Sequence, residues 1–269
     1  MFGWRARTNF YGYFQRDRLR DDSGSEVLAL TDKQGVSADQ RWRVKKFQVI
    51  YGYRYERNHT FDPEPGSDPL PFDIVATIAK LSEAFIFDRR DDPINSRKGT
   101  FNSVSFDQSA PFLGSDVSNR KLLMQQFVFV PIGRLVLASR AQIGFAYGQD
   151  QLQYDDRFRA GGATSVRGYG EESLGPRVNG LLAGGDRLMI LNQEARFNLY
   201  RWVNGVAFVD AGNIFAKGED WSGLRIGYGI GIRLDTPVGL LRGDIGIPKT
   251  DISQSRAGAR FYFGFGHIF

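Results

Sequence analysis

Cysteine is absent from the 269 residues of the chain. This absence excludes disulfides and thiolate metal sites, and it fits either chance in a reducing compartment or passage through an oxidising one. No run of about 18 consecutive apolar residues occurs, which excludes a transmembrane helix. A membrane β-barrel stays open, because its strands need only about 10 residues of alternating pattern.

The first ten residues, MFGWRARTNF, lack the apolar core and the small-residue cleavage site of a signal peptide. We therefore expect any export signal to lie outside this chain or to have been removed. The net charge is +5, but no cluster of Lys and Arg with interleaved aromatics is present. The charges recur at alternate positions instead, which favours a polar wall and predicts no nucleic-acid partner.

Signals for catalysis are also missing. The only two histidines, His59 and His267, have no metal-ligand spacing. The Gly-x-Gly stretches lie in predicted strands with no helix after them, so they are not nucleotide loops. No serine has His and Asp partners in a nucleophilic pattern. We expect no enzyme activity, no cofactor and no metal ion.

Alternation of apolar and polar residues dominates the chain. The segment AGARFYFGFGHIF shows it most clearly, and a second case is GLRIGYGIGIRLD. In the former, one predicted face carries Ala259, Phe261, Phe263, Phe265, His267 and Phe269, and the other carries Gly258, Arg260, Tyr262, Gly264 and Gly266. The aromatic face is predicted to meet lipid, and the face with Gly, Arg and Asp is predicted to meet the lumen of a barrel.

About twelve such segments are present, several of them near 12 residues long, which exceeds the usual strand of a soluble sandwich. They are predicted near 6–18, 34–44, 47–58, 73–88, 99–109, 119–131, 134–147, 187–200, 203–211, 222–235, 238–247 and 257–269. Short connections alternate with longer ones, which are expected at 19–33, 59–72, 110–118, 148–186 and 212–221. The prediction is an all-β, antiparallel transmembrane barrel that occupies residues 1–269.

The longest connection, 148–186, contains RFRAGGATSVRGYGEESLGP and shows no periodicity. It is either a loose surface loop or a functional segment. Its glycines favour the second interpretation, because Gly161, Gly162 and Gly168 permit tight turns or close approach to another surface.

The segment AGGATSVRGYGEESLGP resembles the loop motif of the BamA/TamA-like outer-membrane assembly factors, the outer membrane protein 85 superfamily. The core of the motif is Val166, Arg167, Gly168 and Tyr169. The resemblance implies a loop that folds into the lumen and an arginine that docks on acidic groups of the wall. Further similar segments are FDRRDDPINSRKGTF, FVDAGNIF and GIGIRLDTPVGLLRGDIGIP. Phe265 and Phe269 resemble the C-terminal signal of outer-membrane barrels.

Two departures from the family accompany the resemblance. Family barrels have sixteen strands, whereas about seven are predicted here before the loop and five after it. The periplasmic POTRA domains of the family are not found in this chain. We therefore expect either a shortened member or the C-terminal part of a longer protein.

An arginine in a lumen needs a charged partner. Asp210 and Glu194 are predicted to be that partner, whereas Asp235 and Asp244 fall on lumenal positions beside Arg233 and Arg242. Alternatively, these acids only balance neighbouring wall arginines.

Three functions remain open. The leading hypothesis is insertion, assembly or translocation of polypeptides at a bacterial or organelle outer membrane, with a weakly paired seam between the first and last strands as the template for an incoming strand. The alternatives are a passive pore and an inactive fragment of a larger barrel. The expected partners are outer-membrane lipid, client outer-membrane or secreted polypeptides, and periplasmic proteins.

Overall fold

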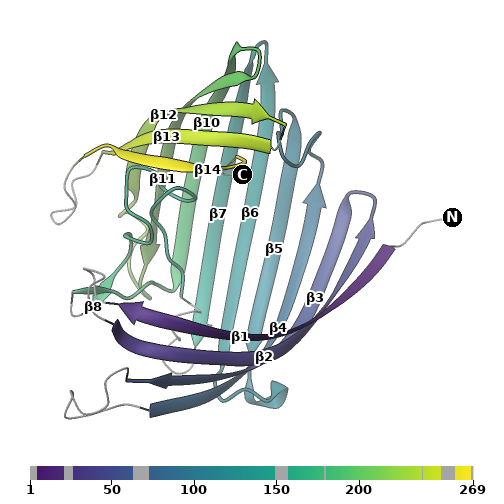
Figure 1. Ribbon diagram of the computed structural model, residues 1–269, viewed down its shortest axis with the longest axis vertical. Coiled ribbons are helices and arrows are strands. Elements are labelled where there is room, and N and C mark those ends of the chain that lie inside the picture. Colours follow the sequence, from purple (N-terminus) through teal and green to yellow (C-terminus); the bar gives the residue numbers. More distant parts are fainter. Residues whose placement is uncertain are drawn as a thin grey trace. The chain divides into compact units, whose positions relative to one another are not determined.

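The computed structural model describes residues 5–20, 27–62, 73–148, 157–178, 180–237, 239–249, 258–267 and 269. Twelve strands form one sheet in which the spatial order follows the chain (Figure 1). They are β1 (Arg5–Arg20), β2 (Val27–Val44), β3 (Phe47–Phe61), β4 (Asp73–Asp88), β5 (Gly99–Ser109), β6 (Asn119–Ile132), β7 (Leu135–Gly148), β10 (Arg187–Tyr200), β11 (Val203–Phe215), β12 (Arg225–Thr236), β13 (Gly239–Pro248) and β14 (Arg260–Phe265). The predicted number of strands is confirmed.

Two small elements complete the list. A single 3₁₀ turn, η1, spans Pro111–Leu113, and a two-stranded ribbon joins β8 (Arg177–Val178) to β9 (Leu181–Leu182). No helix in the described part of the chain is long and apolar enough to cross a membrane.

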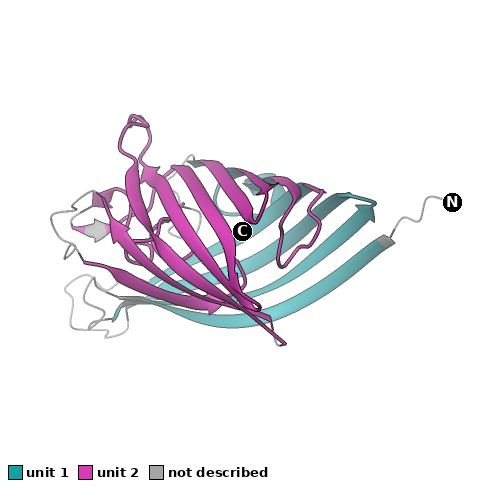
Figure 2. Cartoon of the chain, turned by 90° about the horizontal axis from the view of Figure 1, so that it is seen from above, with its two compact units in different colours: residues 1–85, 105–122, 147–156 teal, residues 86–104, 123–146, 157–269 magenta. Residues whose placement is uncertain are grey.

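The chain divides into two compact units (Figure 2). Unit 1 comprises Met1–Phe85, Ser105–Leu122 and Tyr147–Asp156. Strands β1, β2 and β3 pair antiparallel in it. Cross-strand ion pairs lie at its surface, with Arg16 Nε 2.5 Å from Asp32 and Lys33 Nζ 2.7 Å from Asp17. Opposite charges on facing strands stabilise the pairing only modestly at exposed positions.

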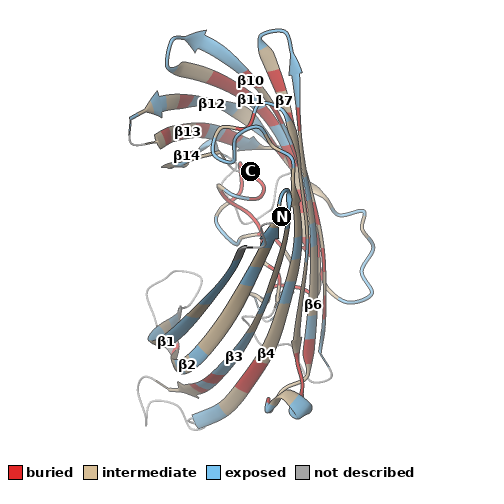
Figure 3. Ribbon diagram, turned by 90° about the vertical axis from the view of Figure 1, so that its right-hand side faces the viewer, coloured by how far each residue is buried: buried red, intermediate tan, exposed pale blue. Residues whose placement is uncertain are grey.

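Unit 2 comprises Ile86–Val104, Leu123–Ala146 and Arg157–Phe269. Its strands β7 and β10 to β14 pair antiparallel, and the register between β10 and β11 shifts between Asn198 and Tyr200. One face, here called the polar face, carries Asn192, Glu194 and Arg196 of β10, Asp210 of β11, Arg233 of β12, Arg242 and Asp244 of β13 and Tyr262 of β14, all of them buried (Figure 3). The opposite face exposes Val209, Tyr228, Ile230, Ile232, Phe261 and Phe263. The predicted division into an apolar and a polar face is therefore present.

Several predicted loops are shorter than expected because the strands continue into them. Strand β2 begins at Val27, β3 runs to Phe61 and β11 runs to Phe215. The alternation is weak in these extensions, and backbone pairing with the neighbouring strand decides where they end. Residues 149–156 of the predicted long loop lie outside the described residues.

The C-terminus differs from the prediction. Strand β14 ends at Phe265, and Gly266 follows with a φ of 77°, a left-handed conformation that glycine adopts readily. His267 and Phe269 therefore do not continue the lipid-facing row of Phe261, Phe263 and Phe265. Phe269 is instead buried, and its ring lies 6.2 Å from that of Phe129.

Candidate functional site

The loop segment 157–178 lies against the polar face of unit 2. Asn192 Nδ2 donates to the carbonyl of Ser165 at 2.6 Å, and Arg140 Nη1 donates to the carbonyl of Thr164 at 2.8 Å. Val166, Arg167 and Tyr169 are each no more than 2% exposed. A loose surface loop does not bury its central residues in this way, so the described part of this loop is an ordered segment.

Glycines shape the loop where its chain reverses. Gly161, Gly162 and Gly168 all have φ near +100°, and a Cβ at Gly168 would lie 2.8 Å from the backbone of Ile247. These positions therefore need glycine both for their conformation and for the approach to β13. Side chains of the loop close it further, since Ser165 Oγ accepts from the Gly161 amide at 2.8 Å.

Arg167 is the centre of the site. Its Nε and Nη2 donate to the two oxygens of Asp210 at 2.7 and 2.9 Å, a bidentate pair. Its Nη1 donates to Glu194 Oε1 at 2.8 Å and to Asp244 Oδ2 at 3.3 Å. The Arg167 backbone amide also donates to Asp210, at 3.0 Å. Charge-assisted bidentate bonds are the strongest hydrogen bonds that a protein makes, and they fix orientation as well.

The predicted partners, Asp210 and Glu194, are thus both brought to Arg167, and Asp244 joins them. An aromatic ring completes the cage, because Arg167 Cζ lies 3.4 Å from the ring centroid of Phe208. The acids also contact wall arginines: Arg196 Nε donates to Glu194 at 2.8 Å, and Arg233 Nη1 donates to Asp244 at 2.5 Å. The acids therefore balance wall arginines, as the alternative expected, but they also bind Arg167 of the loop.

Glycines in the wall make room for the loop. A Cβ at Gly227 of β12 would lie 1.7 Å from the carbonyl oxygen of Arg167, and one at Gly246 of β13 would lie 2.6 Å from the amide nitrogen of Gly168. The loop backbone therefore rests directly on the backbones of two strands. Strand glycines of this kind mark close approach of another chain segment.

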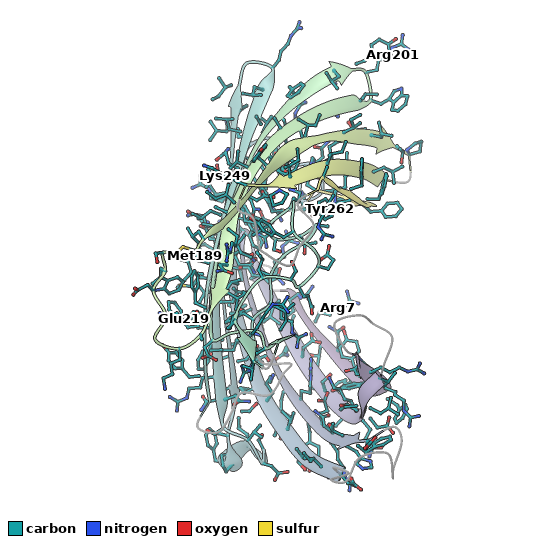
Figure 4. The ribbon with its side chains drawn as sticks, turned by 90° about the vertical axis from the view of Figure 1, so that its left-hand side faces the viewer. Arg7, Met189, Arg201, Glu219, Lys249 and Tyr262 are labelled. Carbon is teal, nitrogen blue, oxygen red and sulfur yellow. The ribbon has the colours of Figure 1, made fainter. Side chains whose placement is uncertain are left out.

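Tyr262 joins the last strand to the loop, and Figure 4 shows its position on β14. Its hydroxyl accepts from the Gly168 amide at 2.8 Å and donates to the carbonyl of Tyr169 at 2.7 Å. Both backbone groups are buried here, so the loss of this hydroxyl would leave a donor and an acceptor without a partner and would destabilise the fold. The contacts of the loop thus extend from β10 to β14.

The Omp85 superfamily domain matches residues 3–269. The chain belongs to the Omp85 superfamily. This membership confirms the predicted transmembrane barrel class and the outer-membrane location.

Relatives of this Omp85 chain cover it to different extents. The outer membrane protein assembly factor BamA of Nitratidesulfovibrio vulgaris is 28% identical over 244 residues, which are 82% of this chain and 30% of that protein. Outer envelope protein 80 from the chloroplast of Arabidopsis thaliana is 33% identical over 121 residues, 41% of this chain and 15% of that protein. The chain therefore spans about a third or less of the length of these relatives.

Among solved structures, BamA from Haemophilus ducreyi lacking POTRA domains 1–3 superposes with a TM-score of 0.82. That match has 15% sequence identity and covers 97% of this chain and 58% of the other. At this identity the likeness is one of fold.

Only a part of this Omp85 site was predictable from the sequence. Tyr262 and Phe208 were not predicted to contact the loop, although Tyr262 is an aromatic residue with a hydroxyl on the polar side of the alternation. Asp244 was placed on the correct face but not beside Arg167. Strand register brings Asp244 there, since it pairs with Gly231 of β12 and Tyr262 of β14.

Replacing Tyr262 with phenylalanine is expected to lower the free energy of unfolding by about 1–3 kcal/mol, the cost of leaving buried polar groups without a partner. The amide of Gly168 and the carbonyl of Tyr169 are those groups. Urea unfolding in detergent measures the change. Tyr228→Phe is the matched control, because Tyr228 is 45% exposed on the opposite face of β12, and equal losses in both variants would contradict the expectation.

The buried C-terminal ring gives a second, smaller expectation. Phe269 packs against Phe127, Phe129 and Arg196. Phe269→Leu should lower the free energy of unfolding by about 1 kcal/mol or more, because the smaller side chain loses the ring contacts and leaves part of the packed site empty. Phe263→Leu, at a position 84% exposed, should change it much less. The same urea titration compares the two, and the ranking would be refuted by a larger effect at Phe263. The role of Phe265 and Phe269 as an assembly signal stays a prediction.

Proposed function

We propose that this chain is the barrel part of a factor that assembles or translocates polypeptides at an outer membrane, and that Arg167 keeps its loop seated on the polar face during that work. The supporting observation is the enclosure of Arg167 by Asp210, Glu194 and Asp244, which links the loop to β10, β11 and β13. The relative from N. vulgaris is named as an assembly factor, which supports the same activity.

The mechanism follows from which strands are fixed and which are not. The loop holds β10, β11 and β13 through the ion pairs of Arg167, and β12 through the Tyr169 hydroxyl, which donates to the carbonyl of Ile226. Among the described residues, its hydrogen bonds to β14 come from the Tyr262 hydroxyl. Strand β14 is also short, at six residues. A short last strand held by few groups is suited to exchange its pairing with an incoming strand, which is the basis of strand addition. The chemistry needed is hydrogen bonding and positioning, so we propose no enzymatic step.

The test uses the 269-residue chain refolded in liposomes with an added urea-unfolded outer-membrane client. Formation of folded client, which resists detergent until it is boiled and is read as a mobility shift between boiled and unboiled samples, should be several times faster than in empty liposomes. Arg167→Met should remove the acceleration. Arg177→Ala, an exposed arginine of the same loop, should keep it.

The alternatives give different results in this assay. A passive pore would raise ion conductance without any effect on client folding, and Arg167→Met would leave that conductance unchanged. An inactive fragment would not fold into a closed barrel, so its own boiled and unboiled samples would migrate alike. Either result would overturn the proposed function. Client polypeptides, outer-membrane lipid and periplasmic proteins remain the proposed partners.

A further inference from the structure

A polar cavity of about 140 Å³ lies in unit 2 at the end of the hairpins β10–β11 and β12–β13, and loop residues Asn95 to Arg97 form a part of its lining. This volume exceeds what a single water molecule needs. We call it the arginine pocket, because its charged lining residues besides His267 are Arg97, Arg134, Arg196, Arg201, Arg233 and Asp235. Figure 4 shows Arg201 at the tip of the β10–β11 hairpin.

The two arginines at the base of the pocket are buried and incompletely bonded. Arg196 is 6% exposed and Arg233 is 0% exposed. Among the described residues, Nη1 of Arg196 and Nε of Arg233 have no hydrogen-bond acceptor. A buried cationic N–H without an acceptor is costly. Such a group in a polar cavity therefore points to a bound acceptor.

The buried charged side chains of unit 2 carry a net positive charge. Among the described residues of unit 2, the buried arginines are Arg167, Arg196, Arg233 and Arg242, and the buried carboxylates are Glu194, Asp210 and Asp244. One buried positive charge is therefore not matched by a buried carboxylate. Arg242 does not line the pocket, and its Nε and Nη1 also lack an acceptor among the described residues, so the count does not place this charge in the pocket. The free N–H groups of Arg196 and Arg233 are what point to an acceptor there.

The single acid of the pocket does not fill this role. Asp235 Oδ2 accepts from Asn204 Nδ2 at 3.0 Å, and Asp235 Oδ1 accepts from Asn95 Nδ2 at 3.5 Å. His267 adds no charge of either sign, since burial and then the charge of Arg196 lower its pKa to about 3, and the ring is neutral at pH 7. Its Nε2 lies 3.2 Å from Asn95 Oδ1.

The loop over the pocket is held in place by its own aspartates. Asp91 Oδ1 accepts from the amides of Arg97 and Lys98 at 3.0 and 3.1 Å, so that the pKa of Asp91 lies below its usual range although burial raises it. Asp92 Oδ1 accepts from the amide of Asn95 at 3.0 Å. Arg97 is thus presented on an ordered turn, and preorganised donors lose little freedom when they bind a ligand.

We propose that the arginine pocket binds a phosphate group, either as free inorganic phosphate or as the headgroup of an anionic lipid. Several guanidinium groups converge from different elements, and a tetrahedral anion offers oxygens in several directions, whereas a carboxylate offers two in one plane. The pocket lies at strand ends, where basic sites of membrane proteins meet lipid headgroups. The site is independent of the proposed assembly function.

The first test is calorimetric titration of inorganic phosphate into the refolded chain in phosphate-free detergent. Saturable binding is expected, and the double variant Arg97→Gln/Arg134→Gln should weaken it about tenfold or more. These two residues are exposed and lie outside the Arg167 network, so the variant should fold. Lys217→Gln/Arg177→Gln removes the same charge from exposed positions of unit 2 outside the pocket and should bind as the unchanged chain does.

Three outcomes would overturn the proposal: no saturable binding by the unchanged chain up to about 10 mM phosphate, equal affinity in the pocket variant, or equal weakening in the control. If the glutamine variant fails to show a boiling-dependent mobility shift, Arg97→Lys/Arg134→Lys decides. It keeps both charges but lacks the planar fork of arginine. Weaker binding by this variant supports the pocket, and unchanged affinity contradicts it.

A second arm separates the two sources of phosphate. The chain is placed in phosphatidylcholine vesicles with or without phosphatidylglycerol, and the phosphate titration is repeated. Loss of binding only with phosphatidylglycerol assigns the pocket to a headgroup, and equal binding in both assigns it to free phosphate. Both results keep the pocket as a phosphate site.

Discussion

Arg167→Met should lower the free energy of unfolding by about 3–5 kcal/mol, because removing one partner of a buried ion pair leaves the other charges uncompensated. Here the loss falls on Asp210, Glu194 and Asp244, which are at most 2% exposed. Methionine fills a similar space, so the effect reports the charge more than the volume. The measurement is urea unfolding of the refolded chain, followed by the mobility shift between boiled and unboiled samples.

A control variant shows whether the removal of another arginine from the loop has the same effect. Arg177 is exposed in the same loop, and its guanidinium donates to the carbonyl of Gly180. Arg177→Ala should change the free energy of unfolding by less than about 1 kcal/mol, as usual for surface positions. Equal destabilisation by both variants would show that the network around Arg167 does not stabilise the fold.

Charge reversal at both ends of the bidentate pair gives a sharper result. Exchanging the charges of Arg167 and Asp210 leaves the new acid beside Glu194 and Asp244. The double reversal should therefore restore little of the stability that the single reversal removes. An isolated pair would recover most of it, so this comparison separates a network from a pair.

Gly227→Ala should release the loop from the polar face. The added Cβ would lie 1.7 Å from the carbonyl oxygen of Arg167, and neither backbone can move without breaking strand pairing or the ion pairs. The cost should reach or exceed the upper end of the about 1–3 kcal/mol that overpacking typically costs. Trypsin should then cleave after Arg167, which is fully buried in the unchanged chain.

Gly243→Ala is the control for this prediction. Gly243 also lies in a strand of unit 2, but a Cβ there would meet only the ring of Phe263, at 3.7 Å. This variant should keep Arg167 protected from trypsin. Protection that persists in Gly227→Ala would mean that the loop does not depend on contact with β12.

The strands were predictable because alternation is a local property of the sequence. Most predicted boundaries agree within a few residues, as at β4 (73–88) and β10 (187–200). The position of Arg167 followed from a loop motif, and its two predicted acids followed from strand parity. Asp244 and Tyr262 needed the register between β12, β13 and β14, which no local pattern encodes.

The C-terminus shows where alternation misleads. The pattern continues through GFGHIF without a break, yet the strand ends at Phe265. A single left-handed residue, Gly266, redirects the chain, and packing of Phe269 against Phe129 stabilises the new path. Glycine permits this conformation but does not require it, so the alternation predicted a strand through to Phe269 and gave no sign of the turn.

Because Arg167 is completely buried, dissolved salt should weaken its ion pairs less than it weakens the surface ion pairs of unit 1. The surface pairs of unit 1, such as Arg16 with Asp32, are screened once the Debye length falls to about 3 Å in 1 M salt. The Arg167 network excludes counterions and keeps its full interaction under the same conditions. A high-salt wash therefore weakens the ion pairs between β1 and β2 while the loop stays in place.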